Sequence, residues 1–286
     1  MIGEKNPIWK MKMQKESLKK LLSKLTLNLR DSVESSTKKV GCIFLKMDKF
    51  PLHQKKLHET LWGIIDTKEY RPRGKKLFDL HRRYEYTAKA NKVPCRPEEA
   101  LERFIIESND DRFYNQIPIG GGKESIDIGI AESDSKFTFV ELKPWKSTAS
   151  PMYAVIESLK NLMEYRVIIK RRIKVIKKYN EMNLTLLAPE TYYNQYGLIN
   201  HAGKMGKNKL FNVKRLLENL SEEFQISMSF VALRLSYDEF ISNCRKTYDR
   251  CGVSGQDKVK VSKQDSIFSL KRENWNNLVS SDQMIF

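Results

Sequence analysis

Two short segments with alternating apolar residues constrain this fold more than any other feature of the chain. They are ESIDIGIAE at residues 124–132 and KFTFVELK at residues 136–143. Alternation with a period of two is typical of strands that present one face to a core. Only residues 133–135 separate the two segments, so we expect an antiparallel hairpin with a three-residue turn.

The register of this hairpin follows from matching the apolar residues across the two strands. One face becomes continuously apolar when the following residues are paired: Ile126 with Leu142, Ile128 with Val140, and Ile130 with Thr138. In the same register Asp127 lies directly across from Glu141 on the other face. Directly opposed Cβ atoms are about 4.5–5.5 Å apart, and like charges at that separation destabilise a sheet.

The opposed carboxylates of Asp127 and Glu141 therefore predict a cation between them. Oxygen ligands favour a hard divalent ion, Mg²⁺ or Mn²⁺. Lys143 projects from the same face, within reach of a metal-bound water or a phosphate oxygen, and such a group suits phosphodiester hydrolysis. The alternative interpretation is a ladder of surface salt bridges on a solvated sheet face.

The glycine run that precedes the hairpin is not a nucleotide-binding P-loop. A P-loop requires GxxxxGK followed by Ser or Thr, between a strand and a helix. Here Lys123 follows the glycines 120–122, the next residue is Glu124, and the segment after it has the pattern of a strand. We therefore expect a flexible hairpin turn.

The remaining sequence predicts three regions. Residues 1–90 are expected to form a basic, mainly helical region that could recognise nucleic acid, residues 91–250 an α/β core with a mixed central sheet, and residues 251–286 a polar C-terminal tail. Predicted helices are 14–35, 54–66, 76–90, 96–107, a long helix beginning after Pro151, and 211–223. Predicted strands besides the hairpin are 40–47, 112–119, 183–189 and 225–236.

At the hairpin the sequence resembles a known group. Asp127, a spacer, and then Glu141-Leu142-Lys143 resemble the signature of the PD-(D/E)XK nuclease superfamily, the fold of many restriction and repair nucleases. The predicted elements over residues ~96–190 have the order α-β-β-β-α-β of the restriction-endonuclease-like core. Ile126 stands in place of the nominal proline, and Pro144 follows the lysine.

The resemblance implies a role for each residue of the signature. Asp127 and Glu141 would ligate Mg²⁺ or Mn²⁺ together with the main-chain carbonyl of Leu142. Lys143 would orient or help to deprotonate the attacking water and would stabilise the charged transition state. Some branches of the superfamily add a glutamate from the first helix, for which Glu102 is the candidate.

Neighbouring helical residues are further candidates. Glu99 is the second candidate for the added glutamate, and the helix after the hairpin could present Glu157, Lys160 or Asn161 to a substrate. Glutamates are also common on exposed helix faces, so a purely structural role for Glu102 and Glu157 stays open. For the nearby Trp145 we expect a place in the core.

Charge identifies the class of partner. The net charge is +17, which indicates a polyanion, with nucleic acid the first candidate and an anionic membrane surface the second. Residues 91–145 form an acidic stretch, with 7 Lys/Arg against 11 Asp/Glu, between two basic flanks. Solvated lysine faces would also produce such flanks. The residues predicted to contact nucleic acid are Lys146, Lys160, Arg71, Arg73, Arg82 and Arg83.

The sequence argues against a membrane-spanning or secreted protein. No apolar run approaches the ~20 residues of a membrane span, and the first residues lack the apolar stretch of a secretory signal. The four cysteines are scattered, as in a protein with reduced thiols, and the histidines do not have the spacing of zinc ligands. We expect a cytoplasmic or nucleoid-associated protein, and a homodimer is left open.

Together these features predict a metal-dependent nuclease. DNA is favoured over RNA, and an endonuclease of restriction, defence or repair type over an exonuclease, by analogy with the superfamily. The competing hypothesis is a non-catalytic nucleic-acid-binding protein built on a nuclease-like scaffold. A peripheral membrane protein is a third hypothesis.

Overall fold

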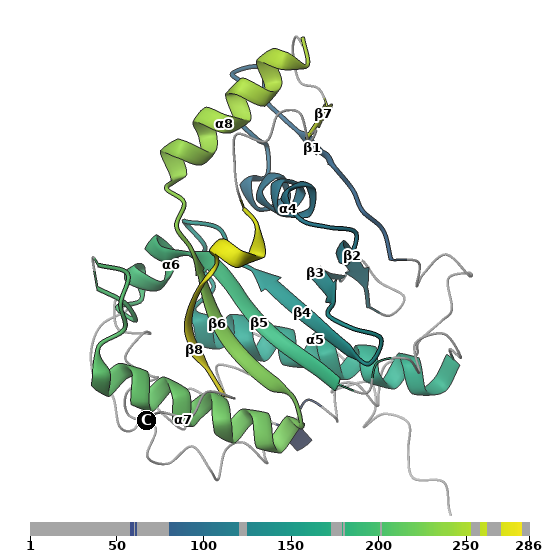
Figure 1. Ribbon diagram of the computed structural model, residues 1–286, viewed down its shortest axis with the longest axis vertical. Helices are drawn as coiled ribbons and strands as arrows, with labels where there is room; N and C mark the ends of the chain where they lie inside the picture. Colours follow the sequence, from purple (N-terminus) through teal and green to yellow (C-terminus); the bar gives the residue numbers. More distant parts are fainter. Residues whose placement is uncertain are drawn as a thin grey trace, which may run out of the picture.

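The computed structural model describes residues 58, 59, 61, 80–119, 125–172, 179, 181–200, 202–252, 258–261 and 270–281. Their centre is a six-stranded mixed sheet with the strand order β2-β3-β4-β5-β6-β8 (Figure 1). Strands β4, β5 and β6 are parallel, and each of the other strands is antiparallel to its neighbours. The six strands are β2 (Phe113–Pro118), β3 (Ser125–Ala131), β4 (Lys136–Leu142), β5 (Glu181–Pro189), β6 (Ser227–Leu233) and β8 (Asn276–Ser280).

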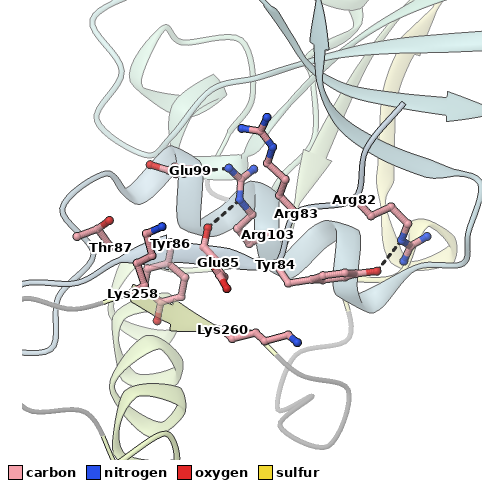
Figure 2. Close-up of a pocket in the computed structure, with 10 residues that line it drawn as sticks. All are labelled: Arg82, Arg83, Tyr84, Glu85, Tyr86, Thr87, Glu99, Arg103, Lys258 and Lys260. Carbon is pink, nitrogen blue, oxygen red and sulfur yellow. Dashed lines mark hydrogen bonds and ion pairs between the residues drawn. The ribbon is translucent and has the colours of Figure 1, made fainter. Parts of the chain in front are cut away.

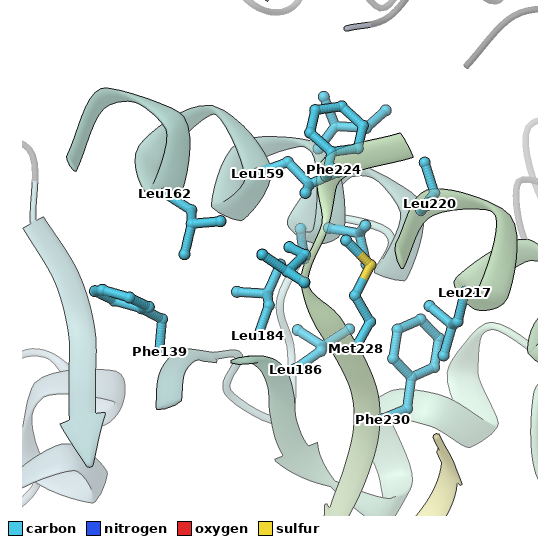
Figure 3. Packing of buried hydrophobic residues seen from close by; sticks show 14 of the residues in the cluster. Phe139, Leu159, Leu162, Leu184, Leu186, Leu217, Leu220, Phe224, Met228 and Phe230 are labelled. Atoms are coloured by element: carbon cyan, nitrogen blue, oxygen red, sulfur yellow. The ribbon is translucent and has the colours of Figure 1, made fainter. Parts of the chain in front are cut away.

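Helices cover both faces of this sheet. The described helices are α4 (Pro97–Ser108), α5 (Pro151–Arg172), α6 (Glu190–Gln195), α7 (Lys207–Phe224), α8 (Tyr237–Arg250) and the 3-10 turn η5 (Arg272–Asn274). Helices α5 and α7 pack on one face through a cluster that includes Phe139, Leu186 and Phe230 (Figure 3). Helices α4 and α8 pack on the other face against a second cluster that includes Val140 and Leu187.

Local sequence explains several of these elements. The β5 run LTLLA and the β6 run SFVAL are nearly continuous in apolar residues, because parallel strands at the centre of a sheet are buried on both faces. Pro97 lies in the first turn of α4, where its missing N–H leaves no bond unmade. Ser236 caps α8 by accepting a hydrogen bond from the amide of Glu239.

A small two-stranded sheet lies beside α4. Strand β1 (Glu85–Thr87) pairs with β7 (Lys258–Lys260) in antiparallel register, with Tyr86 opposite Val259. Both of these central residues are buried in the cluster under α4 and α8, whereas the two lysines of β7 are exposed. The ribbon therefore presents a polar outer face from residues far apart in the sequence.

The predicted order of elements is confirmed from α4 to β6. The structure has α4, β2, β3, β4, α5, β5, α7 and β6 at the positions expected, and the fold is α/β with a mixed central sheet. The short helix α6 and the helix α8 were not predicted.

Two expectations were wrong. A helix was predicted at residues 76–90, but residues 81–88 form no helix and include β1, because Tyr84, Tyr86 and Ala88 alternate and Tyr86 reaches the core. Residues 276–280 of the predicted polar tail form β8, which pairs with β6 and closes one edge of the central sheet.

The remaining predictions for the N-terminal region fall mostly on residues outside the described part of the chain. Residues 58, 59 and 61 of the predicted helix 54–66 are helical. Arg71, Arg73, the helix 14–35 and the strand 40–47 lie outside the described residues, as do the glycines 120–122. Strands β2 and β3, on either side of these glycines, pair from Pro118 with Ser125 onward, as a hairpin requires.

Candidate functional site

The hairpin has the predicted register over most of its length. Ile128 pairs with Val140 and Ile130 with Thr138, and the turn lies at residues 133–135. The ladder does not continue to the predicted pairs Ile126–Leu142 and Asp127–Glu141.

At the open end of the hairpin the backbone ladder gives way to a side chain. The amide of Leu142 donates a hydrogen bond of 2.8 Å to Oδ2 of Asp127. Ile126 packs in the cluster under α5, whereas Ile128 packs in the cluster under α4, so the alternation of faces breaks at Asp127. This break brings the Asp127 carboxylate to the backbone of β4.

Glu141 on β4 and Lys143, which directly follows β4, are buried. Glu141 is 5% exposed and Lys143 is 8% exposed. Nζ of Lys143 lies 2.5 Å from Oε1 of Glu141 and 3.4 Å from Oε2 of Glu157 on α5, while its amide donates to the carbonyl of Leu187 on β5. Burial excludes the alternative of a salt-bridge ladder on a solvated face.

The surroundings perturb the pKa values of all three signature residues. Burial, then the charges of Glu141 and Glu98, raise the pKa of Asp127 well above its ordinary value. Burial also raises the pKa of Glu141, against the opposing effect of the Lys143 ammonium. For Lys143, burial alone would lower the pKa, but the carboxylates of Glu141, Asp127 and Glu157 outweigh it and raise the pKa.

Helix α4 adds two carboxylates to this group. Glu98, which the sequence analysis did not select, is close enough that its charge raises the pKa of Asp127, as does the charge of Glu102. The pKa of Glu98 is raised to about 6, chiefly by burial, with the Lys143 charge opposing the increase. Glu99 instead points toward Arg103, with 3.4 Å between Oε1 and Nη2. The sequence does contain a signal that could have identified Glu98: it lies four residues before Glu102, and residues with this spacing share one face of a helix.

Both carboxylate oxygens of Glu102 are occupied by neighbouring side chains. Arg103 donates to Oε1, and Nε2 of Gln116 donates to Oε2 at 3.1 Å. The side chain of Glu102 is buried, and burial raises its pKa to about 7 despite the Arg103 charge. Glu98 makes no hydrogen bond or ion pair with the part of the chain that the structure describes.

Gln116 is the second site residue that the sequence did not reveal. It follows Asn115, which pairs with Ile128, and precedes Ile117, which pairs with Ile126, so it lies opposite Asp127. Its φ of 57° is in the left-handed region, which a residue other than glycine rarely adopts. Such strained residues cluster at functional sites.

The positions expected to contact nucleic acid separate into two groups. Arg82 donates to the carbonyls of Ile106, Asn109 and Asp110, so it caps the C-terminal end of α4 rather than facing a ligand. Lys160 is mostly buried, with Nζ 3.6 Å from Oε1 of Glu164.

Two of the expected nucleic-acid contacts are accessible. Arg83 and Lys146 are exposed, and Nζ of Lys146 lies 5.4 Å from the ring centre of Tyr237.

Asn161, a candidate for substrate contact, is buried. Trp145 is in the core as predicted, with Nε1 donating to the carbonyl of Leu235 at 2.7 Å.

A cavity of about 400 Å³ lies on the other side of α4, against the β1–β7 ribbon (Figure 2). Five cationic and two anionic side chains line it, together with Tyr84, Tyr86 and Thr87. The cationic residues are Arg82, Arg83, Arg103, Lys258 and Lys260, and the anionic residues are Glu85 and Glu99.

Comparisons with known proteins give no match. No family model, no curated protein and no solved structure matches this chain. Among the described residues, no group of three or more His, Cys, Asp or Glu side chains is arranged to hold a metal ion. No helix in the described ranges is both long enough and apolar enough to cross a membrane.

Proposed function

We propose that this chain is a metal-dependent nuclease with a restriction-endonuclease-like core. The proposal rests on one observation: Asp127, Glu141 and Lys143 meet at the open end of the β3–β4 hairpin, where Glu141 on β4 and Lys143 just after β4 are buried and ion-paired. The order α4-β2-β3-β4-α5-β5 supports it, since it is the order of elements in the PD-(D/E)XK core.

The residues at the hairpin suit a divalent cation of the Mg²⁺ or Mn²⁺ type. Asp127 and Glu141 would supply carboxylate oxygens, and Leu142 would supply its carbonyl oxygen. Oδ1 of Asp127 accepts no hydrogen bond from the described residues. Burial and then the charge of Glu141 raise the pKa of Asp127, so added positive charge would be favourable. When bound, such an ion polarises a phosphoryl oxygen and makes a water molecule more acidic.

The raised pKa of Lys143 favours a role in stabilising negative charge over a role in deprotonating water. An ammonium that keeps its proton at neutral pH can donate hydrogen bonds to a phosphate oxygen and stabilise the negative charge that develops there. It does not suit the removal of a proton from water. The carboxylates of Glu141 and Glu157 hold its Nζ in place.

Helix α4 contributes the additional acid. Glu98 suits this role better than Glu102, because both oxygens of Glu102 already accept hydrogen bonds from Arg103 and Gln116. We therefore propose Glu98 as the helix carboxylate of the site and Glu102 as a residue that supports it. The preferred substrate is DNA, by analogy with the superfamily.

The test is cleavage of supercoiled plasmid by the full chain in Mg²⁺, in Mn²⁺ and in EDTA. The parent protein is expected to nick or linearise the plasmid only with a divalent ion, and Asp127→Ala and Lys143→Ala are expected to abolish cleavage. Lys136→Ala, at the other end of β4, is the matched control and should leave cleavage unchanged. A parent protein that binds DNA but cleaves no plasmid, duplex, single strand or RNA would favour the non-catalytic alternative.

A further inference from the structure

The cavity between α4 and the β1–β7 ribbon has the charge of an anion-binding site. It is lined by residues from three parts of the chain, namely residues 82–87, helix α4 and strand β7 (Figure 2). At the floor of the cavity the buried guanidinium of Arg103 donates hydrogen bonds to the carbonyl of Glu85 and to the carboxylates of Glu99 and Glu102. Each nitrogen of this guanidinium therefore has a protein partner.

The rim of the cavity, in contrast, carries exposed positive charge. Arg83, Lys258 and Lys260 are exposed, and none of them forms an ion pair with the described residues. Glu85 lies opposite Lys260 in the ribbon, yet no ion pair joins them there. Three cationic groups at one concave surface repel one another, and an anionic ligand would relieve that repulsion.

The cavity is close to the candidate active site. Glu102 on α4 accepts a hydrogen bond from Gln116, which lies opposite Asp127, whereas Glu99 and Arg103 on the same helix line the cavity. The two sites thus lie on two sides of one helix, whose diameter with side chains is about 10 Å. A polymer with regularly spaced phosphates can reach both sides at once.

We propose that the rim formed by Arg83, Lys258 and Lys260 binds the phosphate backbone of the nucleic acid that enters the candidate active site. The proposal rests on the proposed function for its choice of ligand, and on the shape and charge of the cavity for its location. Tyr84 at the same rim offers a surface for the sugar or base next to the bound phosphate. Contacts of these side chains with phosphate do not depend on the base sequence, so they would contribute affinity and orientation rather than sequence specificity.

The experiment measures binding separately from cleavage. A short fluorescein-labelled DNA duplex is titrated with the full chain in EDTA, across a series of KCl concentrations, with fluorescence anisotropy as the readout. The test variant is Lys258→Gln with Lys260→Gln. The matched control is Lys204→Gln with Lys207→Gln, which removes the same charge from exposed lysines at and before the start of α7.

Each phosphate contact that is lost should reduce the slope of log K against log salt by about 0.9. We expect the test variant to lose one or two such contacts and to bind about tenfold or more weakly at low salt. The control should keep the parent slope. Lys258→Arg with Lys260→Arg should also keep it, which shows that charge rather than folding of β7 decides the result.

Two outcomes would overturn the proposal. One is a test variant with the slope and affinity of the control. The other is a parent protein that does not bind the duplex but sediments with vesicles containing phosphatidylserine. If the parent protein binds DNA through the rim but does not cleave plasmid, the nuclease proposal is refuted and the phosphate site is supported. If the parent cleaves plasmid and the test variant binds DNA with the parent's affinity and salt dependence, only the phosphate site is refuted.

Discussion

The left-handed backbone of Gln116 makes an unusual prediction about protein stability. At an ordinary strand position glycine is less stable than alanine by about 0.5–1 kcal/mol, because it loses more conformational freedom on folding. At Gln116, where φ is 57°, alanine retains a steric penalty of about 1–2 kcal/mol that glycine avoids. We therefore expect Gln116→Gly to be more stable than Gln116→Ala by about 0.5–1 kcal/mol.

Both variants also lose the hydrogen bond to Glu102. Leaving a buried acceptor without its partner costs about 1–3 kcal/mol, so both should be less stable than the parent. The loss depends on pH, because the pKa of Glu102 is about 7 in the folded protein and lower in the unfolded chain. Burial of Glu102 therefore penalises folding increasingly as pH rises from the pKa of the unfolded chain to about 7, and the penalty is constant above that pH. The amide of Gln116 matters most above pH 7, where Glu102 is ionised.

Urea denaturation above and below pH 7 measures both effects. The matched control is the same pair of substitutions at Tyr114, a β2 residue whose φ is not positive, where alanine should be the more stable variant. If alanine is at least as stable as glycine at position 116, the strain at this position does not exist. If the deficit of Gln116→Ala is the same on both sides of pH 7, the amide does not support an ionised Glu102.

Three further predictions concern other parts of the sheet. Gly129→Ala places a Cβ 2.5 Å from a ring carbon of Phe137, so we expect a loss of about 1–3 kcal/mol by thermal denaturation, and a melting temperature within 1 °C or so of the parent would contradict this packing. Lys143→Met leaves the buried carboxylate of Glu141 without its cation and should destabilise the protein by about 3–5 kcal/mol at neutral pH. An unchanged urea midpoint would show that the Glu141 carboxylate is not buried as described. Burial of Glu132 would raise its pKa, but hydrogen bonds from Arg272 and a threonine hydroxyl lower it overall, so this residue stabilises the fold above its unfolded pKa and the effect is lost in acid. Glu132→Gln should remove part of the acid-induced loss of stability, about 1 kcal/mol or less because Arg272 is nearly half exposed, and identical acid unfolding curves would refute the assignment.

The hairpin was predictable because its pattern leaves few choices. Alternating apolar residues on both strands and a three-residue connection fix the register wherever one face is buried. That register places Ile128 opposite Val140, as the structure has it. The register does not reveal the break at Asp127, which lies opposite the left-handed backbone of Gln116 in β2.

Other features depend on contacts that are distant in the sequence. β8 is short and three of its five residues are polar, so only its pairing with β6 makes it part of the sheet. The choice between Glu98, Glu99 and Glu102 depends on how α4 is rotated against the sheet, which acidic residues on a helix do not determine. β1 was predictable from the alternation of Tyr84, Tyr86 and Ala88, although the sequence analysis predicted a helix over residues 76–90.

Burial is what distinguishes the interpretation of Asp127, Glu141 and Lys143 as a functional site from the interpretation as a structural ion pair. Removing a carboxylate and an ammonium from water carries a penalty that their attraction offsets only in part, and apolar residues of similar size often stabilise a core as well or better. In this chain Glu141 and Lys143 are 5% and 8% exposed, with further acids nearby whose charges raise the pKa values of their neighbours. A cluster with an excess of negative charge destabilises the fold unless a cation joins it, and perturbed groups of this kind are characteristic of catalytic sites. The stability of the parent protein should therefore increase with Mg²⁺ or Mn²⁺, and this increase should disappear in Asp127→Asn.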